Sequence, residues 1–154
     1  MPNRKGVERA AAHGVKIINF VFSASNTHNM QNVRKTTRES LAELATLQEY
    51  CTEQKMQLNA SIATTFGCPF EGEVKPDTIV AIVKELTALN ITYITLADTT
   101  GVANPKQVYT LMVRLTNDFP DVTFNMHFHN TRGLGLANVL ASLQAGITHF
   151  DAAL

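Results

Sequence analysis

The sequence has no tryptophan and only two cysteines, Cys51 and Cys68, in 154 residues. Two cysteines do not make the disulfide framework of a small secreted protein, so a reducing compartment is expected. Neither charge sign is in excess, because thirteen basic and thirteen acidic side chains cancel. This balance argues against a nucleic-acid-binding surface and against a charged tail.

Long apolar runs are also missing. No run approaches the roughly 18 residues of a membrane-spanning helix, and the first six residues, MPNRKG, hold no apolar segment that could act as a signal peptide. The composition that remains, 45% hydrophobic and 17% charged, is sufficient for a folded core. We therefore expect one cytoplasmic domain with no nucleic-acid or membrane partner.

Strand and helix patterns alternate along the whole chain. Apolar side chains at every second position predict strands at residues 16–24, 57–66, 93–98, 122–129 and 147–153. Helical spacing predicts a helix before Gly14 and further helices that begin near residues 37, 76, 105 and 134, whereas residues 25–35 have the composition of a polar loop. This alternation indicates parallel strands joined by right-handed crossovers.

One face of nearly every predicted strand is small or polar. Strands of a doubly wound sheet are covered by helices on both faces and are apolar almost throughout, so the pattern favours the inside of a closed barrel near its mouth. The predicted fold class is α/β, a partial (β/α)8 TIM barrel with about five parallel strands in one domain, residues 1–154. Because such a barrel has eight strands and about 250 residues, we expect a longer parent protein. An open five-stranded sheet is the alternative.

The stretch from Val122 to His129 alternates strictly between apolar and polar residues. A strand sends successive side chains to opposite faces, so His127 and His129 lie on the same face. Two neutral imidazoles that converge from one strand are half of a metal site. The alternative is a half-buried strand whose histidines only contact solvent.

In parallel barrels, functional residues lie where strands end and the following loops begin. His127 and His129 occur at that end and on the polar, inward face, so residue type, spacing and position agree. The other polar residues at the strand ends are Ser23, Ser25, Thr64, Thr65, residues 95–100, residues 130–132 and Asp151.

Three motifs carry a resemblance to a known family. They are Gly67-Cys-Pro-Phe-Glu-Gly72, Leu96-Ala-Asp-Thr-Thr-Gly101, and His127-Phe-His-Asn-Thr-Arg-Gly133 followed by Leu136-Ala-Asn138. Together they resemble the 3-hydroxy-3-methylglutaryl-CoA lyase family of TIM-barrel metallolyases, from near residue 2 to residue 154. The first motif is typical of the lyases, whereas the others are shared with isopropylmalate and homocitrate synthases. The five strands would correspond to the fourth to eighth of the family barrel.

The resemblance implies that His127 and His129 bind a divalent cation, Mg²⁺ or Mn²⁺, and that an acyl-CoA is cleaved to acetoacetate and acetyl-CoA. It also implies that four further residues come from segments that this sequence lacks. They are an aspartate ligand, a catalytic arginine, an asparagine ligand and a cysteine that acts as the acid of the reaction. Cys68 aligns with a different loop from that cysteine. Mg²⁺ prefers oxygen ligands, so two imidazoles alone should bind it poorly, and we expect the isolated chain to be inactive.

Two further residues, Asp98 and Asn32, have roles implied by the resemblance, and Asn130 is a third candidate. Asp98 belongs to the family's Asp-Thr element and is a candidate catalytic residue, although strand parity turns it outward, where a carboxylate would instead cap backbone donors of the loop. Asn32 matches a position that contacts the CoA arm. Asn130 either orients His129 or makes a turn.

Two other hypotheses remain. One is a Claisen-type synthase on the same barrel. The other is a non-catalytic barrel fragment that self-associates, since exposed edge strands favour pairing. A homo-oligomer is expected in either case.

Overall fold

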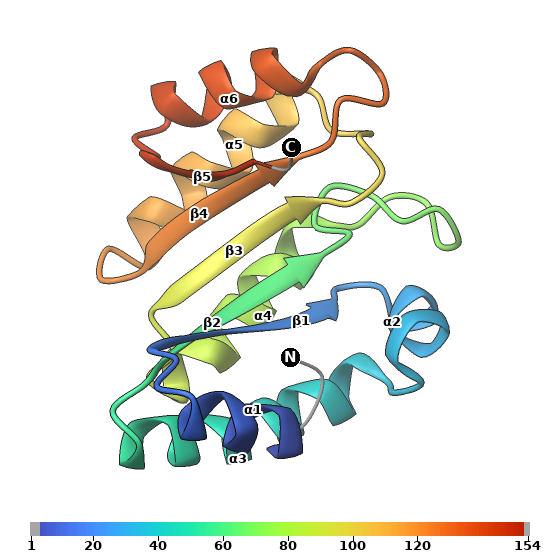
Figure 1. Ribbon diagram of the computed structural model, residues 1–154. Coiled ribbons are helices and arrows are strands. Elements are labelled where there is room, and N and C mark those ends of the chain that lie inside the picture. The colour runs from blue at the N-terminus through green and yellow to red at the C-terminus, as the bar shows by residue number, and fades with distance from the viewer. Residues whose placement is uncertain (1–3, 153–154) are drawn as a thin grey trace.

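The structure is a computed structural model that describes residues 4–152. It contains five parallel strands in one sheet, in the order β1-β2-β3-β4-β5 (Figure 1). The strands are β1 (Ile17–Ser23), β2 (Gln57–Ala63), β3 (Tyr93–Asp98), β4 (Thr123–Phe128) and β5 (His149–Asp151). The helices are α1 (Arg4–Ala12), α2 (Asn26–Val33), α3 (Thr37–Glu53), α4 (Pro76–Ala88), α5 (Pro105–Asp118) and α6 (Gly135–Gln144). Within residues 4–152, every helix is too short or too polar to cross a membrane.

Each strand pairs with its neighbour in the chain. A doubly wound sheet reverses its strand order at a switch point, whereas a barrel adds strands sequentially. Figure 1 shows α4 and α5 behind the strands, α1 and α3 beside β1 and β2, and α6 beside β4 and β5. This is the predicted α/β arrangement of about five parallel strands from a (β/α)8 barrel.

The core lies between the sheet and these helices. One set of alternate strand residues faces it, and the other set faces the barrel interior, which we call the inner face. In β1, Ile18, Phe20 and Phe22 are buried, whereas Ile17 and Val21 on the inner face are 58% and 41% exposed. The helices contribute the buried residues Leu44, Leu47, Cys51, Ile79, Val83, Leu86, Val108, Met112 and Leu115.

The predicted loop at residues 25–35 is wrong, because residues 26–33 form α2. Ser25 caps this helix by accepting a hydrogen bond from the backbone N–H of His28 (3.1 Å). Asn29 is fully buried, accepts from the backbone N–H of Ser23 and donates to the Ser40 hydroxyl (2.8 Å). The helix is therefore held by polar contacts, which leave no apolar stripe for a periodicity argument to detect.

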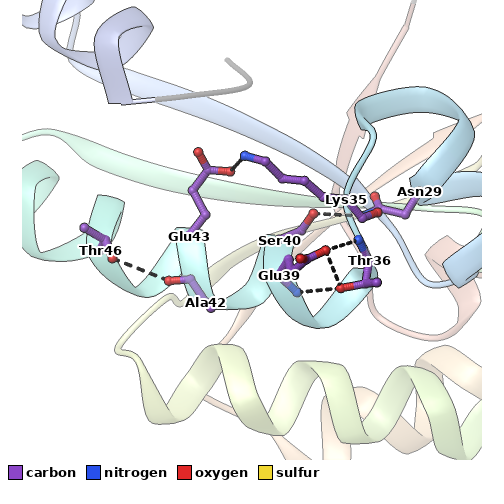
Figure 2. A network of polar contacts seen from close by, with 8 residues as sticks. All are labelled: Asn29, Lys35, Thr36, Glu39, Ser40, Ala42, Glu43 and Thr46. Atoms are coloured by element: carbon purple, nitrogen blue, oxygen red, sulfur yellow. Dashed lines mark hydrogen bonds and ion pairs between the residues drawn. The ribbon is translucent and has the colours of Figure 1, made fainter.

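The start of α3 is fixed by a reciprocal cap (Figure 2). The Thr36 hydroxyl accepts a hydrogen bond from the backbone N–H of Glu39, and the Glu39 carboxylate accepts one from the backbone N–H of Thr36 (2.7 Å). This hydrogen bond holds the pKa of Glu39 below its ordinary value. Lys35 also pairs with Glu43 across the first turns of α3. Together these contacts stabilise the first turns of α3.

Several predicted strand bounds also differ from the structure. β2 ends at Ala63, not at residue 66, because Thr64 adopts a left-handed conformation with φ +58°. β4 ends at Phe128, so His129 is the first residue after the strand. β5 contains residues 149–151 only, and residue 153 of the predicted strand lies outside the described residues.

Candidate metal centre

The imidazoles of His127 and His129 converge at the carboxyl end of β4. Their Nε2 atoms are 3.2 Å apart, and their ring centroids are 5.1 Å apart with an interplanar angle of 71°. His127 is half-buried and His129 is exposed. Although the strand ends at Phe128, the chain still turns His129 to the side of His127, as the alternating pattern predicts.

This separation suits two ligands of one cation. Nitrogen and oxygen ligands lie about 2.0–2.1 Å from a divalent cation such as Zn²⁺ or Mg²⁺, so two ligands at a right angle are roughly 3 Å apart. The separation of the two Nε2 atoms therefore matches that of adjacent coordination positions. No group of three His, Cys, Asp or Glu side chains within residues 4–152 could hold a metal ion. The described residues thus fit half of a metal site.

A chain of polar side chains crosses the inner face, and we call it the inner-face ladder. It includes hydrogen bonds from Asn59 to Asn19 (3.1 Å) and to Thr95 (2.9 Å), and from Asn125 to Thr95 (3.0 Å) and to Asp151 (2.6 Å). These residues come from all five strands. The members of the inner-face ladder are Asn19, Asn59, Ser61, Thr95, Asn125 and Asp151. The ladder gives the barrel interior a polar lining next to His127.

Asp98 is buried at the end of β3, with 1% of its surface exposed. Its two carboxylate oxygens accept hydrogen bonds from the backbone N–H groups of Val102 (2.9 Å) and Ala103 (3.1 Å). These bonds fix the loop between β3 and α5. The geometry matches the outward, loop-capping interpretation of Asp98, and the carboxylate does not join the two histidines in a cluster.

That loop contacts the loop after β4 at Gly101. Gly101 has φ +66°, and a Cβ atom built there would lie 2.7 Å from the backbone nitrogen of Thr131. Thr131 is two residues after His129. The loop fixed by Asp98 therefore supports the loop that follows the histidines.

We expect Gly101→Ala to destabilise the protein and to displace this second loop. A non-glycine residue in the left-handed region costs roughly 1–2 kcal/mol, and the contact with the Thr131 backbone adds to that cost. Gly72→Ala is the matched control, because Gly72 has φ +76° but an added Cβ would meet no atom within 4 Å. Urea denaturation should show a larger loss of the free energy of unfolding for Gly101→Ala than for Gly72→Ala. Equal losses would refute the close contact.

The Gly-Cys-Pro-Phe-Glu-Gly loop forms a small hairpin that is attached to α2. Cys68 lies at its base, where its thiol donates to the Ser25 hydroxyl (2.9 Å) and its sulfur accepts from two backbone N–H groups of the loop. Glu71 accepts a hydrogen bond from the backbone N–H of Thr27 (2.6 Å), and the pKa of Glu71 is lowered by its hydrogen bonds to Thr27. The structure therefore gives Cys68 a part in the loop's framework.

The remaining candidates are Asn32, Asn130 and His28. Asn32 is exposed on α2. Asn130 accepts a hydrogen bond from the backbone N–H of Gly135 (2.9 Å), which is the turn-forming role that the sequence left open. The Nδ1 atom of His28 lies 2.6 Å from the Ser23 hydroxyl, and burial lowers the pKa of this histidine.

A groove of about 600 Å³ separates the hairpin from α5. Its lining includes Cys68, Glu73, Lys106 and Arg132. No pattern in the sequence predicts this groove, because its residues come from three loops and from the helices α4 and α5. Arg132 is the link between the groove and the loop after His129.

The fold is that of a partial TIM barrel, with two histidine side chains paired at the carboxyl end of β4. The HMGL-like family model matches residues 1–154. The chain belongs to the HMGL-like family.

Its relatives are lyases by name. The chain is 41% identical over 154 residues to the (R)-citramalyl-CoA lyase of Chloroflexus aurantiacus and covers 49% of that protein. It is 38% identical over 151 residues, 98% of its length, to a hydroxymethylglutaryl-CoA lyase of Bacillus subtilis and covers 50% of that protein. The chain thus spans about half the length of these curated relatives.

A solved structure shows the same arrangement. An HMG-CoA lyase from Acinetobacter baumannii, in complex with coenzyme A and 3-methylmalate, is 45% identical, with a TM-score of 0.93. The match covers 99% of this chain and 50% of that one. The predicted family and the predicted partial barrel are both confirmed.

Proposed function

We propose that this chain is the carboxyl-side part of a divalent-metal-dependent lyase that cleaves a carbon–carbon bond in an acyl-CoA with a tertiary hydroxyl group. The leading substrate is 3-hydroxy-3-methylglutaryl-CoA, with acetyl-CoA and acetoacetate as products. Three findings support this: the HMGL-like family, the named relatives, and the two imidazole nitrogens 3.2 Å apart at the barrel mouth. The last of these carries the proposal.

His127 and His129 would hold the cation, Mg²⁺ or Mn²⁺, through Nε2. The bound cation supplies Lewis acidity, which lowers the pKa of a substrate hydroxyl and stabilises negative charge as the bond breaks. The chain's other residues position this pair: Asp98 fixes the loop beside it, and the inner-face ladder lines the interior below it. Asn32, exposed on α2, would contact the CoA arm.

Citramalyl-CoA is the second candidate substrate, because the Chloroflexus relative is named for it. Its acyl group is one methylene shorter than the 3-hydroxy-3-methylglutaryl group and carries the same tertiary hydroxyl. One methylene is worth only about 10–200-fold in specificity. The ratio of kcat/KM for the two thioesters, measured on a protein that contains this chain and a complete barrel, distinguishes them. A Claisen-type synthase would instead condense acetyl-CoA with a keto acid when the same protein is supplied with both.

The chain by itself should not turn over either thioester, since its described residues supply only half of a metal site. The test is an assay of the purified 154-residue chain with Mg²⁺ or Mn²⁺, free of any full-length lyase. Product formation above background would contradict this expectation. Acetoacetate and acetyl-CoA formed by the complete protein, and lost in its His127→Ala variant, would support the proposed function.

We also propose that the chain self-associates. Ile17 and Val21 are exposed on β1 at the edge of the sheet, and α6 exposes Leu136 (85%), Leu140 (56%) and Leu143 (49%) on one stripe. Exposed edges and apolar stripes favour association. Light scattering on the purified chain should give at least the mass of a dimer, and a monomer at micromolar concentration would contradict this.

A further inference from the structure

Asp151 occupies a distinctive place on the inner face. The inner-face positions of the described strands are Ile17, Asn19, Val21, Ser23, Gln57, Asn59, Ser61, Ala63, Tyr93, Thr95, Ala97, Thr123, Asn125, His127, His149 and Asp151. Within that set, Asp151 is the one carboxylate, and Lys and Arg are absent. In register it is the direct neighbour of His127 on the adjacent strand. Neighbouring strands are about 4.8 Å apart, so the two side chains lie next to each other.

The position of the Asp151 carboxylate is fixed. Asn125, with 2% of its surface exposed, donates from Nδ2 to the Asp151 Oδ2 atom (2.6 Å) and to the Thr95 hydroxyl (3.0 Å). Both hydrogens of the amide are therefore used. The second oxygen of Asp151, Oδ1, accepts no hydrogen bond from residues 4–152. One oxygen is anchored and the other is available.

A divalent cation at the two histidines would gain from such a group. Two neutral imidazoles contribute no charge to balance the cation, and Mg²⁺ keeps several water molecules that donate hydrogen bonds to nearby carboxylates. Asp151 does not form a direct three-ligand cluster with His127 and His129. A carboxylate beside the pair that is not itself a ligand can act on the cation through water.

We propose that Asp151, anchored by Asn125, is a positioning residue of the candidate metal centre whose free oxygen accepts hydrogen bonds from water on the cation. This inference rests on the metal centre in the proposed function. The competing explanation is purely structural: Asp151 would serve only as an acceptor for the Asn125 amide. The two explanations differ in whether the negative charge matters.

Asp151→Asn separates these explanations, because its amide oxygen can still accept from Asn125 while the charge is lost. Mn²⁺ binding to a protein that contains this chain and a complete barrel, followed by the electron paramagnetic resonance signal of free Mn²⁺, should weaken by about 10–100-fold, the usual effect of losing a partner outside the ligand shell. Asp121→Asn, at an exposed position before β4, should leave the affinity unchanged. The thermal midpoint of Asp151→Asn should stay within about 2 °C of the parent protein, since the hydrogen bond is kept.

Water proton relaxation of the bound Mn²⁺ gives a second readout. A carboxylate that acts through water leaves the number of water molecules on the cation unchanged in Asp151→Asn, whereas loss of a direct ligand would add one. Unchanged Mn²⁺ affinity in Asp151→Asn overturns this inference and leaves the histidine site intact. An absence of Mn²⁺ binding in the parent protein, identical to that of His127→Ala, overturns the metal centre and this inference together.

Discussion

His127→Ala and His129→Ala should each reduce the affinity for Mn²⁺ by about 100-fold or more, because removal of a direct ligand costs at least as much as loss of an outer partner. The two Nε2 atoms are 3.2 Å apart, so they can bind one cation together. One imidazole alone is a single neutral ligand with no geometric selectivity. The electron paramagnetic resonance signal of free Mn²⁺, followed during titration with a protein that contains this chain and a complete barrel, measures the affinity.

His149→Ala is the matched control for these variants. His149 is also an inner-face imidazole, but it lies at the start of β5 and packs against Tyr93, with ring centroids 6.4 Å apart. Its removal should change the affinity less than twofold. A similar loss in all three variants would mean that Mn²⁺ binds to exposed histidines without a defined site.

Asp98→Ala should reduce the free energy of unfolding by roughly 3 kcal/mol. Two backbone N–H groups would lose an ionised acceptor, and hydrogen bonds to charged groups contribute about 1.5–3 kcal/mol each. Asp98→Asn keeps one acceptor oxygen and should lose about half as much. Urea denaturation of both variants measures this order.

The same variants separate the two roles of Asp98. If the Asp98 carboxylate only fixes the loop, Asp98→Ala should lose much of its stability while its Mn²⁺ affinity falls less than about tenfold. Asp118→Ala, at a partly exposed carboxylate near the end of α5, should be nearly neutral in both measurements. Near-normal stability of Asp98→Ala together with lost Mn²⁺ binding would contradict the loop-fixing role and favour direct participation.

The parts of the fold that follow a regular period were predictable. Strand alternation and helical stripes depend on burial of one face, and burial is recorded in the sequence at every second or every third to fourth residue. The convergence of His127 and His129 follows from the same parity. Asp98 follows it too, since its outward position was expected and its buried carboxylate caps the loop.

Contacts between distant polar residues were not predictable in this way. α2 depends on Asn29, whose partners are Ser23 and Ser40, and no local pattern marks a buried asparagine as the centre of a helix. The link from Asn125 to Asp151 joins residues 26 positions apart. Asp151 could be placed at the barrel mouth from sequence, but its anchor depends on the register of β4 and β5.

A crystal structure of a protein that contains this chain and a complete barrel, grown with Mn²⁺ and with the cation located by its anomalous scattering, tests the metal centre most directly. We predict one peak about 2.2 Å from the Nε2 atoms of both His127 and His129, the ordinary metal–nitrogen range. A cation more than about 3 Å from both rings, or rings turned toward the surrounding helices, would contradict the account.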